Sequence, residues 1–463
     1  MTKSLLGLLA TVAGGATIAL IACSSSGGSG FDDPNGTDGD GGPNSSSGFG
    51  TSSGDAAKPA CVGLQCQQVN CGGGDTTVSG KVFAPNGTLG LYNAIVYVPN
   101  DKPDPLPKGA TCDKCGAVSG SPVVTAISEP NGSFVLKNVP VGKNIPLVIQ
   151  IGKWRRQVTI PEVKQCQDNP APADLTRLPR NQSEGNMPHI ALTTGGCDAL
   201  GCMLPKVGID PSEFGKESDG DAKAVHVFAG SGGQAGTANP AQNFWGDINK
   251  LKNYDMVIFS CECSEHLENK TAAFPAVTEY LKAGGRIFTT DFMYTWYKKS
   301  PDTAFASVGD IKGGAPIGVN PMVLDTSFPK GKALADFMDA NNPGNSGKVQ
   351  CDVVFDNLNS IDSAKAQQWA SSGPSPGGPS STHPRVFTVN MPVGVPVDQQ
   401  CGKGVHIDAH VNNPGSGETV SASFPVGCTN NLKPAESLLA FFFFDLASCI
   451  QKENEPPKPP PVK

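Results

Sequence analysis

The pattern of apolar residues changes once along this chain of 463 residues, and the change limits the folds that it can adopt. Between residues 76 and 160, short segments alternate apolar and polar side chains and are separated by turns such as Pro85-Asn86-Gly87, which is typical of antiparallel strands with one buried face. From His189 onward, apolar strand-like segments alternate with segments of helical periodicity, which is typical of a mainly parallel sheet covered by helices. The sequence therefore predicts a multidomain protein, with an all-β sandwich at residues 61–175 and an α/β domain at residues 186–450.

Four motifs follow one another in the predicted sandwich. In chain order they are Ser79-Gly80-Lys81-Val82, residues 94–98 (AIVYV), residues 131–136 (NGSFVL) and Val139-Pro140-Val141-Gly142. This order resembles the carboxypeptidase regulatory-like family, a transthyretin-like Greek-key sandwich, over about 90 residues, with Glu129-Pro130 displacing the acidic residue common before the Asn-Gly turn. The resemblance implies an accessory or spacer module and supplies no catalytic residue.

A cluster of basic and aromatic side chains, Lys153-Trp154-Arg155-Arg156, follows these motifs. Such a cluster can stack on a sugar or meet an anionic surface. More often it guards an edge strand or forms a contact between domains, and we expect that role here.

The α/β domain has four strand-like segments followed by helical ones, and a late strand at residues 405–411 before a closing helix that begins at Pro434. Four such units are too few for a (β/α)₈ barrel. Asn253-Tyr254-Asp255 and Ala283-Gly284-Gly285-Arg286 resemble motifs of the class I glutamine amidotransferase-like fold, particularly its ThuA-like branch. The resemblance covers residues 187–300 and 400–450, implies a mainly parallel, flavodoxin-like sheet, and is interrupted by a Pro/Gly/Ser-rich insertion at about 300–400.

The chemistry that this fold usually carries requires a cysteine on the sharp turn after the Gly-Gly strand, activated by a histidine. The equivalent position here falls at Thr290 or Asp291, neither of which is a thiol, and the histidine of the ThuA-like branch is also missing. We therefore exclude amidotransferase activity.

Polar residues remain at the expected carboxyl ends of the strands, where open α/β sheets bind their ligands. The candidate catalytic residues are Glu265, His266, Asp291 and His410, and the candidate metal ligands are Cys261, Cys263 and His266. A set of Cys, His and acidic residues can bind a metal or catalyse hydrolysis. The alternative, which we prefer, is that both cysteines form disulfides, Asp291 caps or pairs locally and both histidines are solvated, so neither a catalytic residue nor a cofactor is assigned.

The chain has fifteen cysteines, and fourteen remain when Cys23 is set aside. An even number of cysteines in an exported chain is typical of disulfides, which indicates an oxidising compartment. We expect seven disulfides. The alternative is a zinc site at Cys112-x-x-Cys115, although no second CxxC lies at the spacing of a zinc finger.

Residues 1–23 have the features of an export signal, with a positive Lys3 and an apolar stretch at residues 5–21. The stretch ends in Leu20-Ile21-Ala22-Cys23, which resembles the lipobox of bacterial lipoproteins and implies that Cys23 carries the lipid; the alternative is an ordinary cleaved signal and a free cysteine. Ser24-Ser25 does not resemble the Asp-type signal that retains lipoproteins in the inner membrane. We therefore expect the outer membrane.

Two segments are predicted to lack a packed core. Residues 24–60 contain 19 Ser and Gly and five Asp, which is typical of a disordered tether. The Pro-rich tail at residues 451–463 is expected to be extended and mobile.

Together these features predict a lipid-anchored cell-envelope protein with a non-catalytic binding or structural role, towards a glycan or another envelope protein. The net charge of −7 gives no sign of a nucleic-acid partner. The alternative function is an extracytoplasmic hydrolase that acts on carbohydrate or a related small molecule through the α/β domain.

Overall fold

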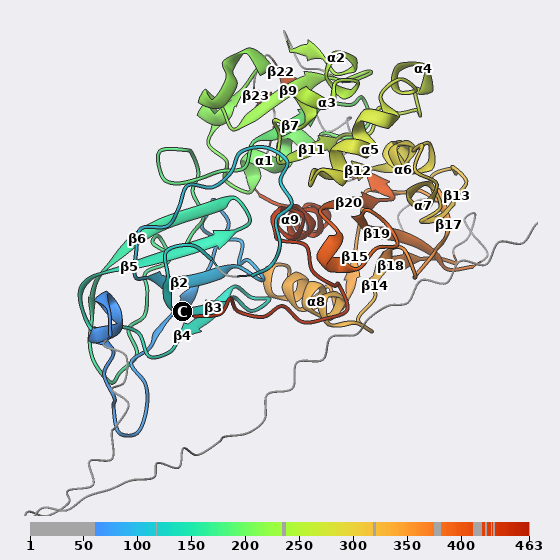
Figure 1. Ribbon diagram of the computed structural model, residues 1–463. Coiled ribbons are helices and arrows are strands. Elements are labelled where there is room, and N and C mark those ends of the chain that lie inside the picture. The colour runs from blue at the N-terminus through green and yellow to red at the C-terminus, as the bar shows by residue number, and fades with distance from the viewer. Residues whose placement is uncertain are drawn as a thin grey trace, which may run out of the picture. The chain divides into compact units, whose positions relative to one another are not determined.

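The computed structural model describes residues 61–116, 118–233, 238–317, 321–374, 381–410, 419–421, 424–426, 428 and 431–462 (Figure 1). The predicted export signal at residues 1–23, the lipid-bearing Cys23 and the tether at residues 24–60 lie outside them. No helix of the described part is long and apolar enough to cross a membrane. The described residues belong to one compact unit, within which the boundary between the two predicted domains stays a prediction.

Six strands form the N-terminal β part, within the stretch where the alternating pattern predicts antiparallel strands. One antiparallel pair joins β1 (Val78–Lys81) to β4 (Ser133–Leu136). An antiparallel four-stranded sheet has the order β3 (Pro122–Ile127), β2 (Ile95–Pro99), β5 (Gly142–Ile151) and β6 (Trp154–Val163). Alternate residues of both sheets, such as Val96 and Phe134, are buried in the same apolar core, as expected for strands with one face covered.

A large mixed sheet forms the rest of the molecule. Its parallel half has the order β10 (Asn239–Pro240), β9 (Val225–Ala229), β7 (Ile190–Thr193), β11 (Met256–Phe259), β12 (Arg286–Thr290) and β20 (Gly402–Ile407), with β8 (Phe214–Gly215) beside β9. Numbered from β7 and without the two-residue strands β8 and β10, this is the 2-1-3-4-5 order of doubly wound sheets. β7, β9, β11 and β12 coincide with the four strand-like segments of the sequence, and β20 covers the start of the late strand predicted at residues 405–411 but ends at Ile407.

The other half of the sheet is antiparallel, which the sequence analysis did not anticipate. β19 (His383–Met391) pairs with β20, and β18 (Gln367–Ser372), β14 (Met322–Leu324) and β15 (Lys348–Val349) continue the sheet. These strands come from the insertion at about 300–400. The predicted parallel arrangement is therefore confirmed for one part of the sheet only, because the Pro- and Gly-rich insertion adds antiparallel strands and makes the whole sheet mixed.

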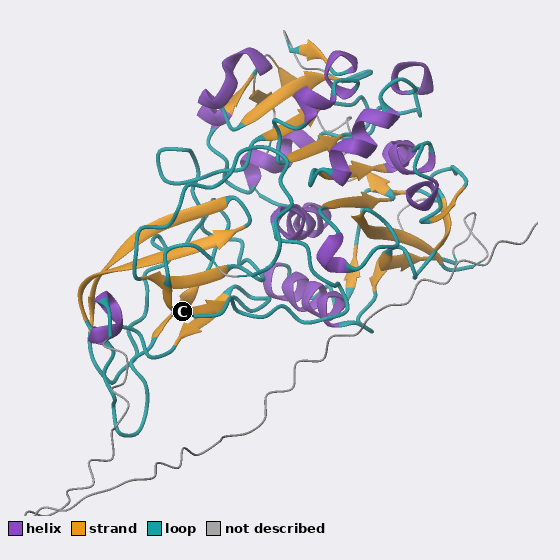
Figure 2. Cartoon of the chain, in the orientation of Figure 1, coloured by secondary structure: helices purple, strands orange, loops and turns teal. Residues whose placement is uncertain are grey.

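Both faces of the sheet are covered (Figure 2). In β11, Met256 and Ile258 belong to one apolar core, and Val257 and Phe259 belong to the other. The first core takes residues of α1, α8, α9 and the β part, and the second takes residues of α2, α3, α5, α6 and α7. The helices are α1 (Met203–Lys206), α2 (Gln242–Trp245), α3 (Ile248–Leu251), α4 (Leu267–Lys270), α5 (Phe274–Lys282), α6 (Thr295–Lys298), α7 (Thr303–Ala306), α8 (Pro329–Asn341) and α9 (Pro434–Ala447).

Short elements complete the fold. The further strand pairs join β13 (Gly309–Ile311) to β17 (Leu358–Ile361), β16 (Val353–Val354) to β21 (Ala409–His410), and β22 (Thr419–Ser421) to β23 (Phe424–Val426). The 3₁₀ helices lie at Gly63–Gln67, Leu200–Cys202, Pro211–Glu213, Glu217–Ala222, Asp291–Tyr294 and Val397–Gln399.

Helix α9 joins the β part to the large sheet. Its run of four phenylalanines is buried on all sides, as expected for a helix that is apolar all round. Phe443 packs against Trp154 of β6 with ring centroids 6.3 Å apart, and Phe442 packs against Trp369 of β18 at 5.1 Å. The basic and aromatic cluster takes part in this contact, because Trp154 is fully buried there and Lys153 pairs with Asp255 beside β11.

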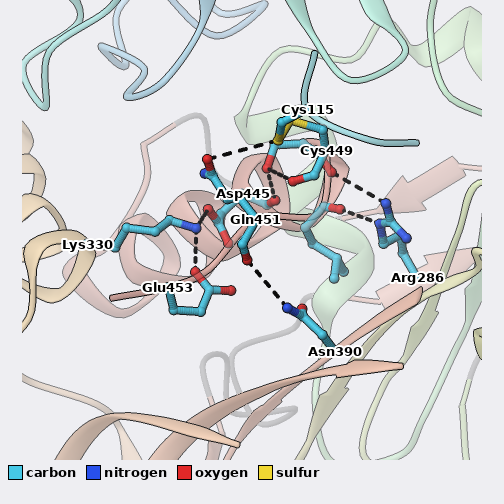
Figure 3. Close-up of a disulfide and its surroundings, with 10 residues drawn as sticks. Cys115, Arg286, Lys330, Asn390, Asp445, Cys449, Gln451 and Glu453 are labelled. Carbon is cyan, nitrogen blue, oxygen red and sulfur yellow. Dashed lines mark hydrogen bonds and ion pairs between the residues drawn. A yellow bond between two sulfur atoms is a disulfide. The ribbon is translucent and has the colours of Figure 1, made fainter. Parts of the chain in front are cut away.

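The end of α9 is held by a buried set of charges (Figure 3). Lys330 of α8 pairs with Asp445 and Glu453, and Lys403 pairs with the same two carboxylates. The Nε of Arg286 donates to the Leu446 carbonyl at 3.0 Å and so satisfies one of the free carbonyls at the helix end. Glu453 therefore ties the start of the Pro-rich tail to the core, while the mobility of that tail stays a prediction.

Six disulfides join twelve of the fourteen described cysteines. The pairs are Cys61–Cys66, Cys71–Cys166, Cys112–Cys401, Cys115–Cys449, Cys197–Cys263 and Cys202–Cys428. The expected disulfides of Cys112 and Cys115 are confirmed, and the alternative of a zinc site there is excluded, because each sulfur is bonded to a cysteine far away in the sequence. The expected seventh disulfide was wrong, because Cys261 and Cys351 are buried free thiols.

Candidate functional site

Three side chains from the ends of adjacent parallel strands meet at one point. Cys261 follows β11, Asp291 follows β12, and His410 lies just beyond β20. The Cys261 Sγ lies 3.2 Å from Oδ2 of Asp291 and 3.4 Å from Nε2 of His410, and these last two atoms are 2.9 Å apart. Cys261 and Asp291 are fully buried and His410 is 8 % exposed. We call these three residues the strand-end cluster.

The strand order explains why these residues meet. β11, β12 and β20 are consecutive parallel strands, so their carboxyl ends lie at one edge of the sheet. Cys261 also lies beside the point between β7 and β11 where the strand order reverses, which is where open α/β sheets bind ligands. The loop after β7 approaches so closely that a Cβ on Gly195 would lie 2.1 Å from the Cys261 carbonyl oxygen, and the Cys197–Cys263 disulfide joins the two loops.

Asp291 occupies a strained turn. Its φ is +42°, a left-handed conformation in which Asp and Asn are among the few non-glycine residues found regularly. The turn leads directly from β12 into the 3₁₀ helix Asp291–Tyr294. Strained backbone conformations of this kind are found most often at functional sites, where the surrounding structure holds them in place.

A second layer of buried polar groups holds the cluster. Asn357 donates through Nδ2 to Oδ1 of Asp291 at 2.8 Å and to Oδ1 of Asp408 at 2.5 Å. Arg385, also fully buried, pairs with Asp408 and with Asp356. Burial raises the pKa of Asp408 to about 8, with Arg385 lowering it and Asp291 raising it further. The second layer therefore fixes Oδ1 of Asp291 and leaves Oδ2 to the cysteine and the histidine.

The charges in the cluster favour a protonated thiol. Burial and the neighbouring Asp291 carboxylate raise the pKa of Cys261 well above its ordinary value, and the thiol donates its hydrogen to Asp291. Burial by itself lowers the pKa of His410, but the hydrogen bond with Asp291 and the charge of Asp198 raise it overall. The cluster thus differs from an activated thiolate, which needs a lowered pKa.

The remaining candidate residues lie apart from this cluster. Cys263 is in a disulfide with Cys197, so it is no metal ligand, as the preferred alternative expected. Glu265 accepts a hydrogen bond from the Tyr294 hydroxyl at 2.7 Å. His266 has a φ of +43° and its Nδ1 contacts the exposed Glu268. The group of converging Cys, His and acidic side chains among the described residues holds Cys261, Asp291 and His410, and a role for Glu265 and His266 stays a prediction.

Sequence reasoning missed two parts of the site. We expected Cys261 in a disulfide and His410 in solvent, whereas both are buried against Asp291. Two members of the second layer, Asn357 and Arg385, were missed as well. Asp408, the third member, is a polar residue that the sequence places with His410 at the end of the late strand. Asn357 and Arg385 lie in the insertion, whose pattern gave no such signal.

Comparison with known proteins adds little. No family model matches this chain, and no curated protein matches it. Among solved structures, it is similar to a GMP synthase-like protein of Thermoplasma acidophilum, with 8 % identity over 57 % of this chain and 95 % of that one and a TM-score of 0.32. A ThuA-like protein of Bacteroides uniformis gives 11 % identity, 55 % and 89 % coverage and a TM-score of 0.31.

A further solved structure covers a smaller share of this chain. A chain of a type II cohesin–X-dockerin complex from Acetivibrio cellulolyticus gives 14 % identity, 32 % and 88 % coverage and a TM-score of 0.16. All three scores are low, so the fold assignment here rests on the strand order and register described above.

Proposed function

We propose that this chain is a lipid-anchored cell-envelope protein with a non-catalytic binding role, its ligand being an envelope glycan. In this proposal Cys23 carries the lipid, the β part is a carboxypeptidase regulatory-like spacer, and the amidotransferase-like domain has lost its nucleophile. The disulfides support an oxidising compartment, since such bonds persist in exported proteins.

One observation carries the non-catalytic role. In a working Cys–His–Asp arrangement, the histidine contacts the nucleophile through one ring nitrogen and the carboxylate through the other. Here Cys261 and Asp291 both contact the same atom, Nε2 of His410. That nitrogen cannot donate to Asp291 and accept the thiol proton at once, so the histidine does not act as a base toward Cys261.

The first experiment separates anchoring from binding. We expect the wild-type full chain, expressed in an exporting bacterium, to fractionate with membranes, and Cys23→Ser to move to the soluble periplasmic fraction. Cys351→Ser is the matched control, because this thiol is buried and distant in sequence from the signal, and it should stay with the membranes. Full membrane retention of Cys23→Ser would overturn the lipid anchor.

The second experiment tests the binding role with the released Cys23→Ser chain. We expect it to co-sediment with purified peptidoglycan sacculi and to release no soluble sugar. A chain that stays in the supernatant would contradict the glycan ligand, and steady release of sugar would contradict the non-catalytic role.

A second candidate function is favoured by the 2.9 Å contact between Asp291 and His410 at the carboxyl ends of the strands. An extracytoplasmic hydrolase acting on carbohydrate would use such a pair for proton transfer. If this function is correct, the wild-type chain should cleave chromogenic glycosides. The His410→Gln variant should remain folded but lose this activity. Absence of turnover across a panel of such glycosides would remove this candidate.

A further inference from the structure

We propose that Cys261, Asp291 and His410 bind a zinc ion or a divalent metal of similar softness through Sγ, Oδ2 and Nε2. The inference adds a ligand to the site described above. The metal site itself follows from the geometry of the three side chains. Only the biological use of the metal rests on the proposed binding role.

The three donor atoms have the size of one face of a zinc tetrahedron. With Zn–S of about 2.3 Å and Zn–N and Zn–O of about 2.0 Å, tetrahedral geometry separates sulfur from nitrogen or oxygen by about 3.5 Å and nitrogen from oxygen by about 3.3 Å. The distances here are 3.4 Å for Sγ to Nε2, 3.2 Å for Sγ to Oδ2 and 2.9 Å for Nε2 to Oδ2. Each pair needs to separate by only a few tenths of an ångström to admit the ion.

The direction of the donors also fits. All three atoms lie within 4.8 Å of one another, and Nε2 faces the thiol and the carboxylate at once. Because both atoms contact the same ring nitrogen, the histidine cannot relay a proton between them. Donor atoms that face one point are, however, what coordination of a single ion requires. One sulfur, one nitrogen and one oxygen form a donor set that suits zinc and is unsuited to Mg²⁺ or Ca²⁺, which prefer oxygen alone.

The second layer is of the kind that supports metal ligands. Asn357 donates to Oδ1 of Asp291, which orients the carboxylate and leaves Oδ2 for the ion, and it is itself held by Asp408. Hydrogen bonds of this type orient metal ligands, and their removal commonly weakens metal binding by about 10–100-fold. The strained φ of Asp291 is then the conformation that brings Oδ2 to the other two donors.

Metal binding also gives Cys261 a role. Twelve described cysteines form disulfides, including Cys263 only two residues away, yet Cys261 is left free beside a histidine and a carboxylate. On binding, the thiol gives up its proton to water and the sulfur donates an electron pair to the ion, with no change of oxidation state. Three protein ligands leave a fourth position for water or for a ligand atom.

The test uses the full chain, purified in detergent from an exporting host. After loading with Zn²⁺ and dialysis, we expect about one zinc per chain by elemental mass spectrometry for the wild type. Cys351→Ser, the matched control for a buried free thiol, should keep the ion. Cys261→Ser and His410→Gln should lose it, and Asn357→Ala should weaken binding by about 10–100-fold.

A second measurement keeps the proposal testable if variants misfold. Co²⁺ added to the wild type and to Cys351→Ser should produce the near-ultraviolet charge-transfer band of thiolate-bound cobalt, with one equivalent saturating it. Absence of the band and of retained zinc in these two proteins would overturn the site, as would full zinc retention by a folded Cys261→Ser/His410→Gln double variant. Membrane fractionation and sedimentation with sacculi are read separately, so failure of the metal site is distinguishable from failure of the proposed function.

Discussion

Trp154 of β6 packs edge-on against Phe443 of α9, with ring centroids 6.3 Å apart and both side chains fully buried. The two residues are far apart in the chain, and their contact joins the core of the β part to the core under the large sheet. The two parts of the molecule therefore share apolar packing as well as two disulfides.

We expect Trp154→Ala to lower the free energy of unfolding by about 3–5 kcal/mol, because the substitution leaves a cavity against α9. Urea unfolding should be followed by near-ultraviolet and far-ultraviolet circular dichroism, and both signals should shift together. Val135→Ala is the control, since Val135 is 51 % exposed and its loss should change stability little. Unfolding of the β part alone, with the rest unchanged, would contradict a shared core.

Peptide mapping without reduction should recover Cys112 linked to Cys401 and Cys115 linked to Cys449. Alkylation of the unfolded, unreduced chain should label two thiols between residues 61 and 463, Cys261 and Cys351. Because each of the two disulfides closes a loop of roughly 300 residues, Cys115→Ser/Cys449→Ser should lower stability by about 2–5 kcal/mol. Complete blockage of all fourteen thiols would show that Cys261 is oxidised in the exported protein.

Lys330→Met should destabilise the fold by about 3–5 kcal/mol, because it removes one of the two ammonium groups that neutralise the buried Asp445 and Glu453. Lys332→Met in the same helix is a matched control: Lys332 is 65 % exposed, and loss of its pair with Asp336 should cost at most about 1 kcal/mol. Chemical denaturation at pH 7 measures both. Equal losses of stability in the two variants would show that the buried ion pairs of Lys330 contribute no more to stability than an exposed pair.

The buried charges around Asp445 also predict that the protein loses stability at acid pH. Burial by itself raises the pKa of Asp445, but Lys330 and Lys403 outweigh burial and hold that pKa below its ordinary value. A depressed carboxyl pKa stabilises the fold above the unfolded pKa of about 3.9, and the stabilisation is lost as pH falls further. Thermal unfolding between pH 5 and pH 2 should therefore show a steeper loss of stability in the wild type than in Asp445→Asn.

A second pH dependence comes from His226. Burial, together with the charge of the neighbouring His189, lowers the pKa of His226 to about 4, and carboxylates such as Asp219 and Glu217 oppose this. Since an unfolded histidine titrates near pH 6.5, the unfolded chain takes up the proton first, and stability should fall as pH decreases from about 6.5 to about 4.

His226→Gln should make this slope shallower in thermal unfolding measured across the same pH range. Tyr254→Phe is the control: it removes the 2.7 Å hydrogen bond to Nδ1 but keeps the imidazole buried, so the slope should remain while overall stability drops by about 1 kcal/mol. A slope unchanged in His226→Gln would assign the pH dependence to other groups.

The amino-acid sequence by itself determined the strands of the β part and of the parallel half of the large sheet, and where polar residues follow them. The alternation in residues 94–98 and the apolar runs at residues 255–260 and 286–290 specify strands through local burial alone. Because a strand's carboxyl end is a local property, Cys261 and Asp291 could be placed at the carboxyl edge of the sheet before the fold was known.

Tertiary structure decided which of these residues meet. Disulfide pairing brings Cys115 to Cys449 across 334 positions, and no local pattern encodes such a pairing. The insertion joined the large sheet because β19 pairs with β20, a long-range contact that its Pro- and Gly-rich sequence conceals. His410 reaches Asp291 and Cys261 only because β20 lies beside β12, and strand order is set by packing across the whole sheet, which no single segment of the chain contains.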